Sequence, residues 1–146
     1  MTAPDDSLQL TATDLRLATF RLARRLRRVR AADAMSDAQL AVLADLRMHG
    51  RRTVSTLAER ERVTAPSMTN MINGLEEQGY VTRTPDADDR RRVQVEITEA
   101  GAEVVVETIR RRDVLLADML AELDFTGEEL ATLRAASELM KRVTDR

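Results

Sequence analysis

The sequence predicts a mainly α-helical protein that carries one small β-hairpin and has a long helix at each end. Apolar residues recur every three or four positions through most of the 146 residues, which is the spacing of amphipathic helices. Val93, Val95 and Ile97 instead alternate with polar residues, as in a half-buried strand. Residues 80–84 form a second candidate strand, and the charged segment between the two runs joins them as a hairpin.

The N-terminal part begins with a polar stretch, residues 1–12, which we expect to be a frayed lead-in. A long helix is predicted from residue 13 to about residue 32, because Leu15, Leu22 and Leu26 fall on one face. Its other faces carry Arg16, Arg21, Arg24, Arg25, Arg27, Arg28 and Arg30. These arginines form either a solvated surface or a surface that contacts a DNA backbone or an acidic partner.

Two shorter helices are predicted next, and each has a recognisable start. Ser36 and Gln39 have the spacing of a capping box, and the helix that they open ends at Gly50. Thr53 is predicted to cap the second, short helix, which a tight turn at 61–63 separates from the following helix.

The helix predicted over residues 64–78 has an apolar side and a polar side. Thr64 is its N-cap candidate, and Pro66 lies in the first turn, where its missing N–H costs nothing. The helix ends at Gly79. The side chains expected to be buried are Met68, Ile72 and Leu75.

Two helices are predicted after the hairpin. Thr98 caps a long helix that runs to about residue 123, and Thr126 opens the last one, with Glu128 and Glu129 in its favourable first turn. The long helices at both ends of the chain are more apolar than a small domain needs. This surplus predicts a helical dimer interface, with an intramolecular bundle as the alternative.

Composition excludes several kinds of site. The absence of cysteine excludes disulfides, cysteine metal sites and thiol redox sensing. The single histidine, His49, lies in the last turn of its helix, where a contact with the helix dipole is expected rather than a functional site. No phosphate loop, nucleophile–base pair or metal cluster is visible, so we expect neither an enzyme nor a cofactor or metal. No apolar run could span a bilayer, and a soluble cytoplasmic protein is expected.

The charge is unevenly distributed along the chain, although the net charge is only -2. The excess of acidic residues lies in the C-terminal third, so the middle of the chain can present a basic surface. Almost all basic residues are arginine, and Lys141 is the one lysine. Arginine suits phosphate and groove contacts, but a biased genome composition could produce the same excess.

The polar side of the 64–78 helix fits the major groove of duplex DNA. Small and amide side chains let a helix sit deep, an asparagine can pair with adenine, and a threonine methyl can pack on thymine. The candidate contacts are Thr64, Ala65, Pro66, Ser67, Thr69, Asn70 and Asn73.

The hairpin tip supplies a second candidate contact with DNA. Arg90, Arg91 and Arg92 follow one another there, and their expected targets are phosphates and a narrow minor groove. Asp89 is expected to pair within the loop and to shape the tip.

The order of these elements and two segments resemble the MarR family of bacterial transcription regulators. The segments are LAERERVTAPSMTNMINGLEEQGYVTR and DADDRRRVQVEITEAG. In that family an Asp, one residue and an Arg precede the return strand, which ends in Leu/Ile-Thr and then a Gly. The matching positions are Asp89, Arg91, Ile97, Thr98 and Gly101.

The resemblance implies a winged helix-turn-helix over residues 36–98 within a single domain, 1–146. It also implies that helices at 10–32 and 99–146 form a homodimer that binds a palindromic operator. Arg91 matches the wing-tip arginine that enters the minor groove, and Arg90 or Arg92 could share that role.

The function expected from this resemblance is transcription regulation, most simply by a repressor that a small ligand releases. Many members of the family respond to aromatic or phenolic ligands, and the absence of cysteine separates this chain from the peroxide-sensing branch. The alternative is a winged-helix module that binds protein rather than DNA.

Overall fold

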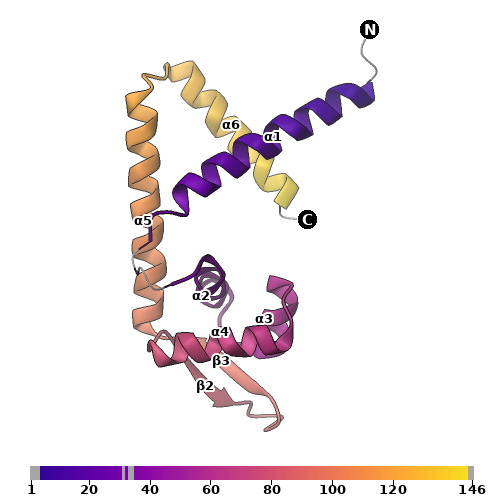
Figure 1. Cartoon of the computed structure of the whole chain (residues 1–146), viewed down its shortest axis with the longest axis vertical. Helices are drawn as coiled ribbons and strands as arrows, with labels where there is room; N and C mark the ends of the chain where they lie inside the picture. The colour runs from indigo at the N-terminus through magenta and orange to yellow at the C-terminus, as the bar shows by residue number, and fades with distance from the viewer. Residues whose placement is uncertain (1–3, 31, 33–34, 145–146) are drawn as a thin grey trace. The chain divides into compact units, whose positions relative to one another are not determined.

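The computed structural model describes residues 4–30, 32 and 35–144 of the chain, in two compact units that meet between Arg112 and Asp113. The elements, in order (Figure 1), are α1 (Pro4–Leu26), α2 (Asp37–His49), β1 (Arg52–Thr53), α3 (Val54–Glu61), α4 (Ala65–Glu77), β2 (Val81–Pro85), β3 (Val93–Ile97), α5 (Glu99–Glu122) and α6 (Gly127–Thr144). The predicted fold class, mainly helical with a small β-hairpin, is confirmed. None of the described helices is long and apolar enough to cross a membrane.

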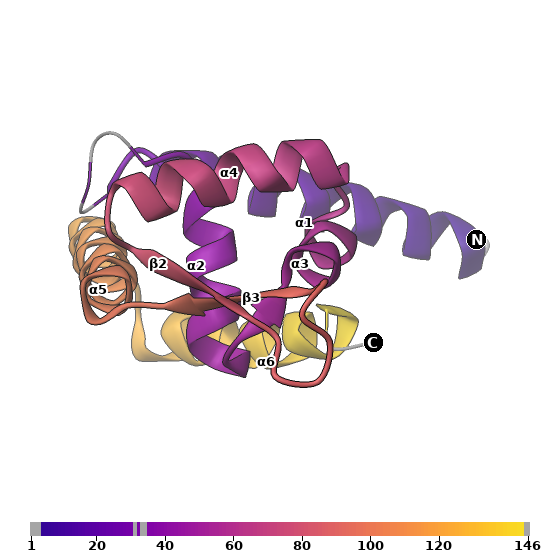
Figure 2. The same ribbon diagram turned by 90° about the horizontal axis from the view of Figure 1, so that it is seen from below.

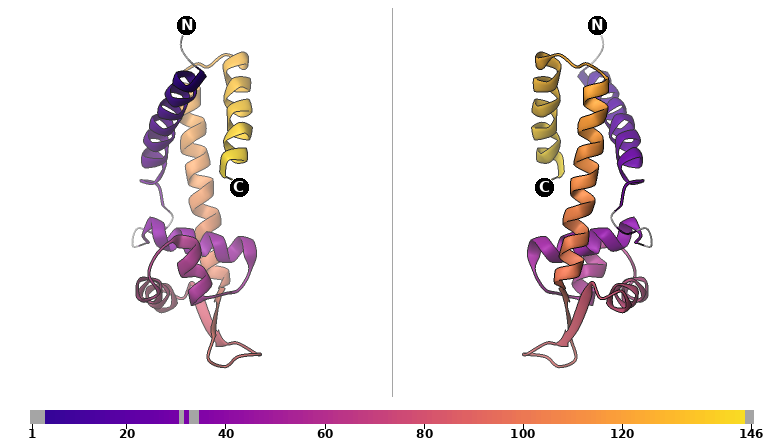
Figure 3. Two further views of the ribbon diagram at one scale, coloured as in Figure 1. Left: turned by 90° about the vertical axis from the view of Figure 1, so that its right-hand side faces the viewer. Right: turned by 90° about the vertical axis from the view of Figure 1, so that its left-hand side faces the viewer.

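The strands form one antiparallel sheet in the order β1-β3-β2. In the hairpin, Val81 pairs with Ile97 and Arg83 pairs with Val95. Figure 2 shows this hairpin beside α4, and Figure 3 shows its tip extending beyond α2, α3 and α4 of the same unit. The hairpin is the predicted wing.

The helix starts follow the predicted capping residues. The Ser36 hydroxyl accepts from the Gln39 N–H at 3.1 Å, and the Gln39 side chain accepts from the Ser36 N–H at 2.9 Å. The hydroxyls of Thr53 and Thr64 cap α3 and α4 in the same way. Arg62 ends α3 with a left-handed backbone conformation, and the chain turns there toward α4. Local side-chain chemistry thus determines where this helix–turn–helix segment begins and turns.

The hydrophobic core lies within the segment 35–105. Leu43 and Leu46 of α2, Leu57 of α3 and Val95 of β3 are fully buried there. From α4 the core receives the predicted side chains Met68, Ile72 and Leu75. These contacts fix α4 against the rest of its unit and leave its other side in solvent.

Two predicted helix boundaries are wrong, and one short strand was not predicted. Helix α1 starts at Pro4, within the stretch predicted to be frayed, and ends at Leu26 rather than near residue 32. Residues 6–20 of this helix are exposed, so no side of the first turns is marked by burial within the chain. Strand β1 was not predicted, because two residues are too short to show an alternating pattern. Residue 31 of the predicted helix lies outside the described residues.

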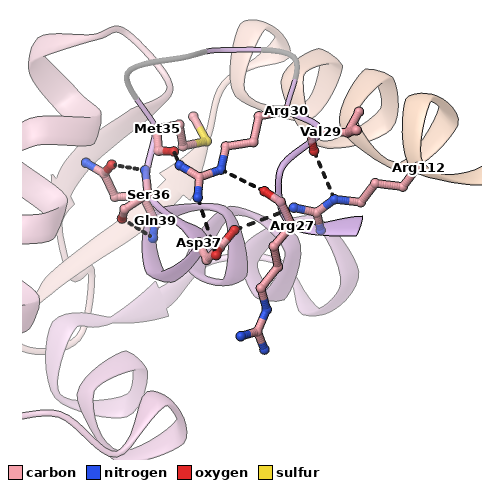
Figure 4. Close-up of polar contacts among 8 residues, drawn as sticks. All are labelled: Arg27, Val29, Arg30, Met35, Ser36, Asp37, Gln39 and Arg112. Carbon is pink, nitrogen blue, oxygen red and sulfur yellow. Dashed lines mark hydrogen bonds and ion pairs between the residues drawn. The ribbon is translucent and has the colours of Figure 1, made fainter. Parts of the chain in front are cut away.

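Arginine side chains hold the segment that follows α1 (Figure 4). The Arg112 Nε donates to the backbone carbonyl of Val29 at 3.1 Å, and Arg30 Nη1 donates to the carbonyl of Met35 at 2.7 Å. Both guanidinium groups also lie near the Asp37 carboxylate, at 3.4 Å for Arg30 and 3.5 Å for Arg112. Side chains therefore satisfy backbone carbonyls of the segment between α1 and α2.

Candidate nucleic-acid interface

The exposed side of α4 carries every residue that the sequence predicted for it. The seven predicted contacts are all exposed, and the apolar side of the same helix is fully buried. They are Thr64, Ala65, Pro66, Ser67, Thr69, Asn70 and Asn73. A buried apolar side and a solvated side of small polar groups is the arrangement that a groove-binding helix needs.

Hydrogen bonds at the start of α4 determine which of these polar groups can still bond to an external partner. The Thr64 hydroxyl donates to the Ser67 hydroxyl at 2.9 Å, and the Thr69 hydroxyl donates to the Ala65 carbonyl at 2.9 Å. Thr69 therefore offers its methyl group outward, and Ser67 keeps its own proton for an external acceptor. Among the described residues, none bonds to the side-chain amide of Asn70.

Acidic side chains shape the wing from inside its loop. Asp86 Oδ1 accepts from the backbone N–H groups of Asp88 at 2.8 Å and Asp89 at 3.1 Å, and its other oxygen accepts from the Gln94 side chain. The Gln94 bond first, and then the two backbone bonds, hold the pKa of Asp86 below its usual value. Asp89 accepts from the Arg91 N–H at 3.0 Å, which confirms that Asp89 pairs within the loop.

The wing arginines are exposed and lie close to α4. Arg90, Arg91 and Arg92 are all exposed, and Arg92 makes a long ion pair of 3.8 Å with Asp89. An open cavity of about 430 Å³ separates the wing from α3 and α4. Its polar lining consists of Thr53, Ser55, Thr69, Arg83, Arg91 and Arg92. Guanidinium and hydroxyl groups around one cavity can donate to phosphate oxygens.

Comparison with known proteins assigns the chain to a family. Residues 35–93 match the model of the MarR family. An uncharacterised HTH-type transcriptional regulator of Mycobacterium bovis is 41% identical over 140 residues, which is 96% of each chain. The chain belongs to the MarR family. It is a DNA-binding transcriptional regulator, and neither the family nor these relatives are enzymes.

Other relatives and structures agree with this family. The transcriptional repressor MdtR of Bacillus subtilis is 35% identical over 96 residues, which is 66% of this chain and 61% of that protein. A transcriptional regulator structure from Pseudomonas aeruginosa has a TM-score of 0.83 and 30% identity, covering 99% of each chain. A MarR mutant from E. coli in complex with operator DNA has the same fold, with a TM-score of 0.64, 24% identity and coverage of 97% and 99%.

The sequence did not point to one residue that bonds to the predicted contacts of α4, Arg83. It lies on β2, two residues after the buried Val81, so its side chain points to the same side of the sheet, toward α4. Its guanidinium donates to Glu76 at 3.0 Å and to the Asn73 side chain. An arginine at an inward position of an alternating strand was the signal available in the sequence.

The described residues offer no site for a metal, since they contain no group of three metal-binding side chains. His49 lies at the end of α2, with Nδ1 at 3.0 Å from Asp45 Oδ1 and 3.2 Å from the Asp45 carbonyl oxygen. Arg60 also pairs with Asp45, at 2.7 Å. These contacts link α2 to α3 and leave His49 outside the proposed interface.

Proposed function

We propose that this MarR-family protein is a homodimeric repressor whose α4 helices and wings bind the two halves of a palindromic operator. The observation that carries the proposal is the pairing of one solvated, small-residue side of α4 with an arginine-rich wing tip in the same compact unit. A major-groove helix and a flanking wing would contact one duplex at two places.

The proposed contact residues divide into those that recognise bases and those that bind the DNA backbone. On α4, Ser67 donates from its hydroxyl, Thr69 offers a methyl group, and Asn70 has an amide that is free to pair with adenine. Asn73 supplies a second amide on the same side of the helix, and Thr64, Ala65 and Pro66 allow close approach to the duplex. Arg90, Arg91 and Arg92 bind phosphates or the minor groove.

A homodimer is supported by the apolar side chains that the terminal helices leave in solvent. Phe20 of α1 is 58% exposed, and Leu139 of α6 is 59% exposed. Helix α6 buries none of its described residues. Such surfaces are rarely left uncovered on a soluble protein, and a second copy of the same helices would cover them.

Repression and release by a small ligand complete the proposal. The relative MdtR is named a repressor, and the E. coli MarR mutant was solved with operator DNA. A ligand would release the operator only by binding more tightly to the state that cannot hold both half-sites. The family resemblance favours small aromatic or phenolic compounds as that ligand.

The test is selection of bound duplexes from a random library with the full chain. We expect two half-sites about 10 bp apart, centre to centre, with affinity that falls steeply as salt rises. A preference for single strands, or affinity independent of salt, would contradict the proposal. Binding of a protein in place of any duplex would instead favour the protein-interaction module.

Two substitutions separate base reading from backbone contact. Asn70→Ala is expected to cost about 1–3 kcal/mol at its cognate base and to relax the preference there. Arg91→Ala is expected to weaken binding to all sequences and to lower the salt slope by about 1. Arg47→Ala, at an exposed position in the last turn of α2 and outside both α4 and the wing, is the matched control and should change neither quantity.

A further inference from the structure

One arginine of the wing fixes the orientation of an asparagine amide on the DNA-facing helix. Arg83 Nη2 donates to Asn73 Oδ1 and, at 3.5 Å, contacts the Thr69 carbonyl oxygen. Arg83 Nη1 donates to Glu76 Oε2 at 3.0 Å. The three partners lie on one edge of α4, and the Arg83 side chain is only 26% exposed. The guanidinium is therefore held against this edge through both of its terminal nitrogens, Nη1 and Nη2.

Chemistry alone settles which end of the Asn73 amide faces Arg83. A guanidinium carries only donors, so it must face the amide oxygen, and the amide nitrogen must point away. A rotation of the amide by 180° would place N–H groups against N–H groups. The two Nδ2 hydrogens are consequently what Asn73 can offer to a base.

Asn70, three residues earlier, has no such constraint. None of the described residues bonds to its amide, so it can turn either way. Bidentate pairing with adenine requires an amide oxygen to accept from N6 and an amide nitrogen to donate to N7. Asn70 can turn both atoms toward one base, whereas the Asn73 oxygen is directed toward Arg83 and its NH2 group points the other way.

We propose that Arg83 is a positioning residue that makes Asn73 a donor-only reader of the major groove. Guanine presents two acceptors on that edge and is the favoured partner, whereas cytosine presents an N4 donor and is rejected. This inference rests on the proposed function, since it assigns a base preference to one residue of the same interface. It assigns the adenine contact to Asn70 alone.

The decisive variant is Asn73→Asp, which keeps the shape of the side chain. One carboxylate oxygen would still accept from Arg83, and the other would present an acceptor in place of the donor. The preferred base at that position should therefore change from guanine to cytosine, because a carboxylate accepts from cytosine N4. Asn73→Ala identifies the base pair that Asn73 contacts, because the base preference at that operator position should disappear in this variant.

A matched pair of variants tests the role of Arg83. Arg83→Lys keeps a donor-only group beside Asn73, and the guanine preference should survive. Arg83→Met removes all donors and frees the amide, so adenine should become acceptable at the same position. The measurement is the base preference from library selection, followed by titration of single-base operator variants. We expect changes of about five-fold or more, the lower end for a good base contact.

The outcomes separate three possibilities. Unchanged base preference in Asn73→Asp and in Arg83→Met, with operator binding retained, would overturn this inference alone. An equal loss of affinity for all bases in Arg83→Met, with a smaller salt slope, would show that Arg83 binds a phosphate and would also overturn it. Failure of the unmodified chain to select any duplex would overturn the proposed function together with the inference. If Arg83→Met does not fold, as judged by circular dichroism, Asn73→Asp and Arg83→Lys still decide.

Discussion

The winged segment and the terminal helices of this chain are stabilised differently. Every buried hydrophobic side chain among the described residues lies between Met35 and Val105. Helices α1 and α6 bury none of their described side chains, although both carry leucines. The winged segment thus has its own core, whereas the terminal helices leave apolar side chains exposed. The comparison predicts that damage to the two regions will have different effects on folding and on assembly.

Removal of residues 127–146 is the largest perturbation of the terminal region. Without α6 the protein should sediment as a monomer or as an aggregate, because the apolar surfaces lose their cover. Operator affinity should fall about 10²–10⁴-fold, since a dimer engages its second half-site at high effective concentration. Analytical ultracentrifugation and operator titration measure the two effects. The unmodified full chain is the control, and a truncated chain that remains a stable dimer would refute this account.

Leucine truncation compares the two regions directly. Leu43 in α2 is fully buried, whereas Leu139 in α6 is 59% exposed in the single chain. Leu43→Ala should lower the free energy of unfolding by about 2–5 kcal/mol at every protein concentration, because it leaves a cavity. Leu139→Ala should act through dimer stability, so its effect should depend on protein concentration. Urea unfolding at several concentrations tests this, and a concentration-independent loss in Leu139→Ala would place that side chain in a core within the chain.

Alanine at two helix glycines compares the regions at finer scale. A Cβ at Gly101, at the start of α5, would clash with the Tyr80 carbonyl oxygen and lie 2.9 Å from Ile97 Cγ1. Gly101→Ala should therefore cost about 1–3 kcal/mol, which outweighs the gain of about 1 kcal/mol in helix propensity. Gly127 of α6 has no atom within 4 Å of that position, so Gly127→Ala should be neutral or slightly stabilising. Thermal unfolding of both variants measures these effects. Equal changes in unfolding temperature would show that α5 does not contact the wing closely at Gly101.

Local chemistry explains which features the sequence could predict. Ser36, Thr53 and Thr64 cap helices through bonds to residues three positions ahead, so the sequence alone locates these helix starts. The burial of Met68 and Ile72 follows from helical spacing in the same way. These two kinds of local signal are sufficient to locate the exposed side of α4.

Features that depend on distant parts of the chain were not predictable. The segment after α1 is held by Arg112, which donates to the Val29 carbonyl, 83 residues earlier in the sequence. Strand β1 exists only because Arg52 pairs with Val95 of β3. The bond between Arg83 and Asn73 likewise joins a strand to a helix, and no local pattern reveals which end of an amide is used.

The smallest expected effect concerns the ion pairs of Glu107 near the end of the first unit. Glu107 lies in α5, five residues before the end of the first unit, and accepts from Arg110 at 2.8 Å and Arg111 at 2.7 Å. Bonds from these two arginines lower the pKa of Glu107 from 4.5 to about 2. Because the folded-state pKa is lowered, the pair stabilises the fold fully above pH 4.5, and its contribution disappears as the pH falls toward 2.

Carboxyl NMR titration should place the Glu107 pKa well below that of an ordinary glutamate. Arg110→Ala together with Arg111→Ala should return the pKa of Glu107 toward 4.5. Glu107→Gln should lower the unfolding temperature slightly at pH 7 and have no effect near pH 2, because exposed ion pairs contribute little to stability. Arg111 also donates to the Arg30 carbonyl at 3.2 Å, so the Arg111 variant alone should additionally loosen the segment between α1 and α2. A Glu107 pKa that does not respond to loss of both arginines would mean that the ion pairs at this boundary do not form in solution.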